Sequence, residues 1–336
     1  MIDVLASVLE RVISIFPAGI AAAASERVWL PRSVSTFAGD IDFAWDVVFW
    51  LSVFFFVLVT ILTVYFMFRY KRRTPDQEAL PAPDHHLPIE IAWSVLPLGI
   101  VVVLFWQGFA QYVNMATPPQ DTYEIQVSAM KWSWLFTYPN GAVTNELHVP
   151  IDTPIELVMT SSDVLHAFFV PEFRVKKDIV PGRYANLWFE ATEAGDYDLM
   201  CTEYCGKDHS AMLAKVTVHE PGEFEPWLKE ESDYYNKGWS MEEIGEKLYN
   251  TRGCKTCHSV DGVAGTGPSF LGLYGIEHAL VGGGTAVVDE NYVRESILEP
   301  QATIVAGYDP VMPTYQGRLT EQDISALIAY LKSLAN

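Results

Sequence analysis

Two long uncharged stretches limit what this chain can fold into more than any other feature of its sequence. No charged residue occurs from Val47 to Phe68, and a second uncharged run extends from Ile91 to Val113. Each run exceeds the ~20 residues that an α-helix needs to cross a bilayer. A buried helix of a soluble core is the alternative, and two such runs argue against it. We therefore predict a transmembrane helix hairpin within residues 40–115.

Basic residues at the end of the first run indicate its orientation. Arg69, Lys71, Arg72 and Arg73 follow that run directly, and the positive-inside rule places such clusters in the cytoplasm. The loop of residues 69–90 is then cytoplasmic. The N-terminal segment and the large portion after the second run lie on the outer face of the membrane.

The N-terminus has a loose signal-peptide shape. Residues 1–24 contain Arg11, a short apolar stretch and three alanines at 22–24. An N-terminus outside the cell needs an export device, which favours cleavage, although Asp3 and Glu10 are unusual in a signal peptide. The alternative is a retained amphipathic helix.

The net charge and the positions of the cysteines exclude some classes of function for the remaining chain and favour others. The formal net charge is −20, which argues against nucleic acid as a partner because nucleic acids attract basic surfaces. The four cysteines form two close pairs, Cys201 with Cys205 and Cys254 with Cys257. Two small-loop disulfides are the plain interpretation for an exported protein. A histidine follows each pair at a metal-ligand or haem-attachment spacing, which favours metal chemistry instead.

The portion after the hairpin divides into an all-β part and an all-α part. Residues 120–220 contain short strand-like runs separated by turn residues, a pattern typical of a sandwich or Greek-key barrel. These runs are Tyr123 to Val127, Ile155 to Met159, Ala185 to Phe189 and Ala214 to Val218. Residues 221–239 form a charged, aromatic linker. In residues 240–336, two helix-capping boxes begin at Ser240 and Thr320, and the second precedes one apolar helical face.

The first cysteine pair belongs to a soft set of metal ligands. The set consists of His166, Cys201, Glu203, Cys205, His209 and Met212. Thiolates, imidazoles and a thioether suit copper. Two thiolates on one loop are able to bridge two copper ions, with one histidine on each ion. Met212 and the backbone carbonyl of Glu203 are then weak axial ligands. A disulfide, a structural zinc and a one-cysteine blue-copper site are the alternatives.

The segment from Cys201 to Met212 resembles the binuclear copper (CuA) loop of cytochrome c oxidase subunit II, Cys-x-Glu-x-Cys-x3-His-x2-Met. The likeness extends in order over residues 40–219, and every ligand position matches. It implies a cupredoxin-like Greek-key fold for the all-β part. It also implies that Glu203 helps to hold a magnesium ion against the catalytic subunit. Trp132, in Lys-Trp-Ser-Trp, resembles the patch where electrons enter the copper site; core packing is the plainer interpretation.

The second cysteine pair belongs to the attachment pattern of haem c. Cys254, Cys257 and His258 match Cys-x-x-Cys-His, in which both thiols bond to the haem and the imidazole ligates the iron. A soft sixth ligand keeps the potential high, and Met312 lies where class I cytochromes c place theirs. Pro268 resembles the residue whose carbonyl accepts a hydrogen bond from the proximal histidine. Residues 240–335 thus resemble a small cytochrome c, with a glycine-rich surface hairpin at 281–285.

Glu90 lies at the cytoplasmic end of the second spanning run. Its surroundings, Pro-Ile-Glu-Ile-Ala-Trp, resemble the oxidase segment whose glutamate marks the entrance of a proton pathway into the catalytic subunit. A simple interfacial anchor is the alternative. Five histidines have no partner at ligand spacing and are expected to be structural or exposed: His85, His86, His148, His219 and His278.

Together the two sites resemble those of subunit II of a bacterial caa-type haem–copper oxidase, which implies a location in the plasma membrane. The expected fold class is a multidomain membrane protein with two transmembrane helices, an all-β cupredoxin-like Greek-key domain and an all-α cytochrome c domain. A soluble cytochrome c or similar donor is expected to reduce the haem, and the electron then passes through the copper centre to subunit I, which reduces oxygen and pumps protons. Subunit III is a further expected partner.

Two sequence features shape this prediction. Neither spanning run contains a histidine, so the oxygen chemistry belongs to a partner. From residue 221 onward the chain has 17 acidic and 8 basic residues, a net charge of −9, which suits a basic donor. The alternatives are a membrane-anchored electron-transfer module without an oxidase partner and the copper subunit of a nitric oxide or nitrous oxide reductase.

Overall fold

The computed structural model of the chain describes residues 29–78 and 83–335. These residues form two compact units. The first unit ends at Thr117, and the second begins at Pro118 and also includes Val34–Thr36. The predicted signal peptide, residues 1–24, lies outside the described residues.

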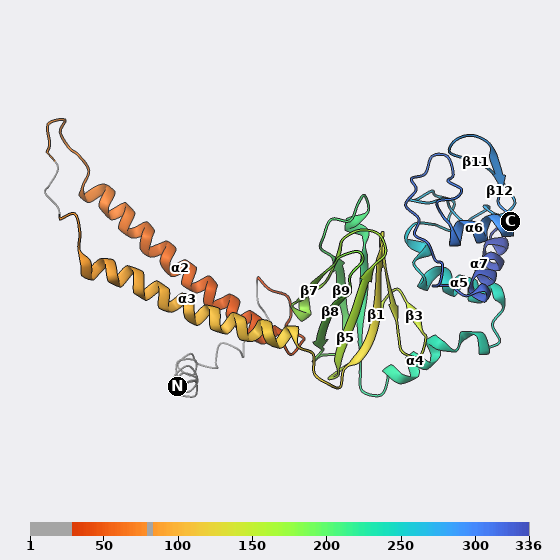
Figure 1. Ribbon diagram of the computed structural model, residues 1–336, viewed down its shortest axis with the longest axis horizontal. Helices are drawn as coiled ribbons and strands as arrows, with labels where there is room; N and C mark the ends of the chain where they lie inside the picture. The colour runs from red at the N-terminus through yellow and green to blue at the C-terminus, as the bar shows by residue number, and fades with distance from the viewer. Residues whose placement is uncertain (1–28, 79–82, 336) are drawn as a thin grey trace. The chain divides into compact units, whose positions relative to one another are not determined.

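The first unit contains the two predicted long helices, α2 (Ala38–Arg69) and α3 (Leu87–Ala116), drawn as a pair in Figure 1. No residue of their most apolar 18-residue windows is buried within the protein. An apolar surface of this size is unfavourable in water and suits lipid contact. Gln111 Nε2 donates a hydrogen bond to Asp40 Oδ2 at 3.1 Å, which links the end of α3 to the start of α2.

The first part of the second unit is a sandwich of two five-stranded sheets (Figure 1). The strands are β1 (Tyr123–Met130), β2 (Ser133–Thr137), β3 (Val143–Thr144), β4 (Leu147–Pro150), β5 (Pro154–Ser161), β6 (His166–Val170), β7 (Val175–Ile179), β8 (Ala185–Glu190), β9 (Gly195–Cys201) and β10 (Leu213–His219). One sheet has the order β3-β2-β1-β5-β8 and the other β4-β10-β9-β6-β7. Within them, β1 pairs in parallel with β5 and β4 with β10, whereas the other neighbours are antiparallel.

The sandwich is held together by the side chains that alternate toward its interior. Along β5 the residues alternate between half-buried and buried over the whole strand. Ile125, Leu157 and Phe168 are fully buried, and each such side chain contributes about 1.5–3 kcal/mol when it leaves water. This core fixes β6 and β9, whose ends carry His166 and Cys201.

The C-terminal part is built from helices α5 (Met241–Thr251), α6 (Glu290–Leu298) and α7 (Glu321–Ser333) (Figure 1). Both predicted capping boxes are present. Helices α5 and α7 approach closely at Gly245, where an added Cβ would lie 2.1 Å from the Ala326 carbonyl oxygen. The glycine-rich stretch is the turn between β11 (Glu277–Ala279) and β12 (Thr285–Val287), as predicted.

The predicted linker contains a helix, α4 (Phe224–Ser232). Its Trp227 stacks on His148, with ring centroids 4.0 Å apart. His148 Nδ1 in turn lies 3.0 Å from His219 Nε2. These histidines are structural, as expected, but the fold makes them partners because β4 and β10 pair across a long stretch of sequence.

Candidate functional site

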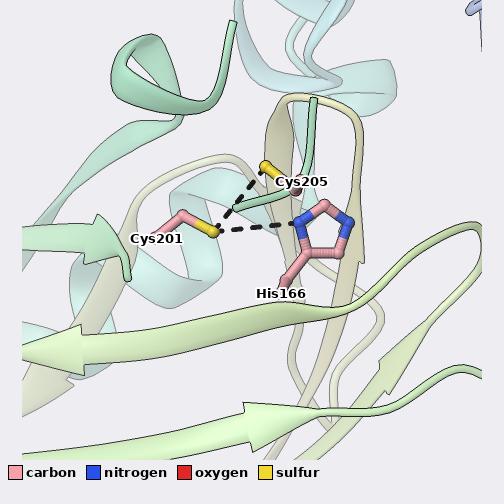
Figure 2. A group of neighbouring side chains, drawn as sticks. All are labelled: His166, Cys201 and Cys205. Carbon is pink, nitrogen blue, oxygen red and sulfur yellow. Dashed lines mark hydrogen bonds between the residues drawn. The ribbon is translucent and has the colours of Figure 1, made fainter. Parts of the chain in front are cut away.

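Three predicted copper ligands meet where β6 begins and β9 ends. Figure 2 shows His166, Cys201 and Cys205 pointing toward one another. Cys201 Sγ lies 3.8 Å from Cys205 Sγ and 3.9 Å from His166 Nδ1. Their ligand atoms all lie within 4.8 Å of one another, and all three residues are buried. The fold therefore gathers a metal-ligating cluster from residues 35 positions apart.

The loop between β9 and β10 adds the remaining predicted ligands. Cys205 Sγ lies 3.5 Å from His209 Nδ1 and 3.8 Å from Met212 Sδ. The backbone oxygen of Glu203 lies 3.3 Å from Cys201 Sγ. The other four residues named from the sequence thus lie around the sulfur atoms of Cys201 and Cys205.

The spacing of these atoms fits shared metal ions. Metal–sulfur bonds of about 2.3 Å in tetrahedral geometry hold two sulfur ligands roughly 3.8 Å apart, which matches the distance between the Cys201 and Cys205 sulfurs. His166 adjoins the sulfur of Cys201, whereas His209 adjoins that of Cys205. Two thiolates with one imidazole beside each would form a set of ligands for soft metal ions, and copper suits such a set.

Asp163 is a functional residue that sequence reasoning missed. Its Oδ1 lies 2.8 Å from His166 Nε2, so the carboxylate orients the ring with Nδ1 toward Cys201. The backbone N–H groups of Lys131 and Val164 donate to the same carboxylate at 2.7 and 2.6 Å. Such outer carboxylates fix the tautomer of metal-ligating histidines. The sequence feature that could have indicated this contact is an acidic residue three positions before His166.

The two thiols have opposite tendencies to ionise. Burial opposes ionisation of Cys201, but hydrogen bonds from His166 and nearby backbone groups outweigh it and lower its pKa to about 6. Burial and the adjacent Cys201 charge raise the pKa of Cys205. Two thiolates this close need a cation between them to ionise together, so the pair favours metal binding with proton release.

The other residues named from the resemblance have defined positions. Trp132 is only 4% exposed, and its indole lies against Gly206 of the copper loop. Glu203 is half-buried on that loop. Glu90 lies in the first turn of α3, where its Oε1 accepts a hydrogen bond from the backbone N–H of His86 at 2.8 Å.

The haem-attachment residues line one cavity in the C-terminal part. This cavity is bordered by Cys254, Cys257, His258, Pro268 and Met312, together with a largely apolar wall. No disulfide joins Cys254 to Cys257. Every residue that the sequence assigned to haem c is therefore brought to one apolar cavity, and the chemistry of these residues fits a covalently attached haem.

His258 is held in place on three sides. Its Nδ1 lies 2.8 Å from the Pro268 carbonyl, as predicted. The ring stacks on Phe270 with centroids 4.6 Å apart. An added Cβ at Gly267 would come within 2.5 Å of the ring. Burial lowers the pKa of His258, which favours the neutral imidazole that metal ligation requires.

A direct hydrogen bond joins the copper loop to the haem-attachment loop. Thr266 Oγ1 donates to Asp208 Oδ2 at 2.6 Å. Asp208 precedes His209, a predicted copper ligand, and Thr266 lies two residues before Pro268. This hydrogen bond directly connects the loops of the two candidate sites.

Comparisons with known proteins match the domains that carry the two candidate sites. The family model of the cytochrome c oxidase subunit II periplasmic domain matches residues 104–218, and that of its transmembrane domain matches residues 23–110. A cytochrome c model matches residues 242–335. Cytochrome c oxidase subunit 2 of Alkalihalophilus pseudofirmus is 30% identical over 298 residues, which cover 84% of this chain and 85% of that protein. The chain belongs to the cytochrome c oxidase subunit II family.

This subunit II carries a fused cytochrome c domain. As a member of the family, it is an oxidoreductase subunit of a haem–copper oxidase. It has a membrane-anchoring part and a periplasmic domain. Cytochrome c oxidase subunit 2 of Bacillus subtilis is 28% identical over 307 residues, covering 84% of this chain and 82% of that protein. The crystal structure of the periplasmic domain of Bradyrhizobium japonicum subunit II is 31% identical, with a TM-score of 0.34, and covers 35% of this chain and 99% of that one.

Proposed function

We propose that this subunit II accepts electrons from a soluble donor at its cytochrome c domain and passes them through its cupredoxin domain to subunit I, which reduces oxygen to water and pumps protons. The observation that carries the proposal is the presence of both redox-competent donor sets on one chain: the paired thiols at Cys201 and Cys205 and the attachment residues at Cys254 to His258. When bound, binuclear copper and covalent haem c supply reversible one-electron chemistry.

The protein's own residues keep both sites rigid. Asp163 holds His166, and the Pro268 carbonyl holds His258. When ligands stay in place as a site gains or loses an electron, the reorganisation energy of electron transfer is small, because preorganised groups need not move. The hydrogen bond between Thr266 and Asp208 supports transfer between the sites, since it ties their two loops together.

Purification of the complete complex tests this function. We expect two coppers and one covalent haem per chain, a co-purifying multi-helix subunit with a-type haem, and azide-sensitive oxygen uptake. Isolation of the chain without such a subunit supports an anchored electron-transfer module instead. Reduction of nitric or nitrous oxide in place of oxygen supports the reductase alternative.

Two variants test the haem site and the copper site separately. Replacing both Cys254 and Cys257 by Ser should remove the haem and leave the near-infrared copper band, whereas Cys205→Ser should remove that band and leave the haem. Both should stop oxygen uptake driven by a reduced soluble cytochrome c. The exposed Lys255→Ala serves as a control within the attachment motif. Sustained uptake in the haem-free variant would show that electrons bypass the cytochrome c domain.

A basic soluble cytochrome c is the proposed donor. The chain from residue 221 onward has a net charge of −9, and such charge raises the association rate with a basic partner at low ionic strength. Oxygen uptake at limiting donor concentration should therefore fall as salt rises. A salt-independent rate would argue for an uncharged donor.

Three further roles follow from the resemblance. We propose Glu203 as a magnesium ligand shared with subunit I, Trp132 as the residue through which electrons enter the copper site, and Glu90 as the entrance of a proton pathway. The hydrogen bond from His86 to Glu90 also fits a plain helix cap. Glu90→Gln keeps a hydrogen-bond acceptor but removes the charge, so it should slow proton uptake without altering either metal spectrum; unchanged turnover would leave Glu90 as a cap.

A further inference from the structure

Among the described residues that line the cavity of the cytochrome c domain, only His278 has a buried side-chain nitrogen or oxygen without a hydrogen-bond partner in the protein. Among the residues that the structure describes, six buried side-chain nitrogen and oxygen atoms lack a hydrogen-bond partner. Only His278 Nδ1 belongs to a residue that lines the cavity together with His258 and Met312. An unsatisfied buried nitrogen destabilises a protein unless a bound group satisfies it, so the atom needs an explanation.

His278 is held in position from both sides. It is the middle residue of β11, where it pairs with Ala286 of β12. Its neighbours Glu277 and Ala279 are exposed while His278 is half-buried, as expected for a strand residue that points the other way. On the far side, the backbone N–H of Ala306 donates to the Ala279 carbonyl at 2.9 Å. The ring is therefore presented to the cavity by a paired strand.

The chemistry of haem c leaves one natural partner for this nitrogen. Thioethers to Cys254 and Cys257 occupy the vinyl positions, and His258 and Met312 are the proposed axial ligands. The only other polar groups of the cofactor are its two propionates. A carboxylate enclosed by apolar side chains such as Leu273 and Val288, which also line the cavity, needs a hydrogen-bond donor.

We propose that His278 is a haem-binding residue whose Nδ1–H donates a hydrogen bond to a propionate of haem c. This inference rests on the proposed attachment of haem at Cys254 and Cys257. A donor to the propionate draws negative charge away from the iron, and hydrogen bonds around a haem are among the features that set its reduction potential. The hairpin β11–β12 thereby contributes to tuning the site that meets the donor.

Three variants of the full-length protein test the proposal. His278→Leu removes the donor, whereas His278→Asn keeps an N–H close to the position of Nδ1. Thr285→Val is the matched control. Thr285 lies on the same hairpin, and its hydroxyl donates a hydrogen bond to the exposed Glu277 carboxylate. Covalent haem content is measured first by the pyridine haemochrome spectrum, and the haem c midpoint potential is then measured by spectroelectrochemical titration.

We expect His278→Leu to shift the reduction equilibrium of haem c about tenfold toward the oxidised form, equal to about 59 mV for one electron. His278→Asn should recover most of this shift, and Thr285→Val should show none. A potential unchanged in His278→Leu, with haem attached, would overturn the proposal. So would loss of the Met–iron absorption band in that variant, because the effect of His278 would then reach the haem through its axial ligation and not through a propionate.

A second measurement covers the case in which the Leu variant does not attach haem. The propionate bending band in the resonance Raman spectrum of the wild-type protein should shift relative to that of His278→Phe, and it should stay in place in His278→Asn. An identical band in all three proteins contradicts the hydrogen bond. Absence of covalent haem from the wild-type chain would instead refute the proposed function.

Discussion

Gly267→Ala should displace the proximal histidine without disturbing the backbone. The φ angle of Gly267 lies outside the left-handed region, so alanine is allowed there, and the three atoms nearest to its Cβ all belong to the His258 ring. The new Cβ would lie 2.5 Å from Cε1, 2.8 Å from Nδ1 and 3.0 Å from Nε2. To restore an ordinary contact of 3.4 Å the ring must move about 0.9 Å. That movement strains the 2.8 Å contact with the Pro268 carbonyl and the stacking on Phe270.

The expected cost combines overpacking of about 1–3 kcal/mol with the loss of a hydrogen bond worth about 1 kcal/mol. We therefore expect the free energy of unfolding of the cytochrome c domain to fall by about 2–4 kcal/mol. A guanidinium titration monitored by haem absorbance measures this change. The ferric spectrum should also gain a high-spin component, because the iron–histidine bond is stretched. Lys255→Ala, exposed in the same segment, should leave both unchanged. A low-spin spectrum and an unchanged unfolding midpoint in Gly267→Ala would refute this reasoning.

The remaining predictions concern the copper loop, the sixth haem ligand, the helix crossing and pH. Met212→Leu should perturb the near-infrared copper band and leave haem c intact; an unchanged band removes Met212 from the ligand set. Met312→Ala should abolish the far-red Met–iron band, and persistence of the band would exclude Met312 as the ligand. Gly245→Ala should destabilise the domain by about 3 kcal/mol although alanine has the higher helix propensity, whereas the exposed Glu246→Ala should stay within about 0.5 kcal/mol; equal effects would contradict the close helix approach. Burial, with the neighbouring imidazole as a second cause, lowers the pKa of His148 to about 4. Because an unfolded histidine titrates near 6.5, the unfolded state binds more protons as pH falls below that value, and stability should drop by about 2 kcal/mol by pH 4.5. In His148→Gln the difference in unfolding free energy between pH 7.5 and pH 4.5 should shrink by that amount; an equal difference in both proteins would contradict the assignment.

Local patterns carried most of what could be predicted from the sequence. The capping boxes at Ser240 and Thr320 act over a few residues and are confirmed, and the two uncharged runs are confirmed as long apolar helices. The Cys-x-x-Cys-His motif is equally local, and its role in haem attachment stays a prediction. The six copper-site residues were also identifiable, because five of them lie within one short segment and only His166 is distant.

Contacts that depend on strand pairing could not be predicted in the same way. His148 and His219 meet only because β4 pairs with β10, and no spacing in the sequence indicates that register. The place of His278 in the haem cavity depends on a hairpin whose far side pairs with residues 304–306. The linker helix α4 is set by an aromatic cluster around Trp227, which single-sequence patterns do not encode.

The 3.8 Å gap between the Cys201 and Cys205 sulfurs also bears on how the protein is assembled. A disulfide has sulfurs about 2.05 Å apart, so a small adjustment of this loop suffices to form one. The compartment outside the cytoplasmic membrane of bacteria is oxidising. Delivery of metal to a newly exported chain is therefore in competition with oxidation, and maturation requires that the thiols be kept or returned to the reduced state until the ions arrive.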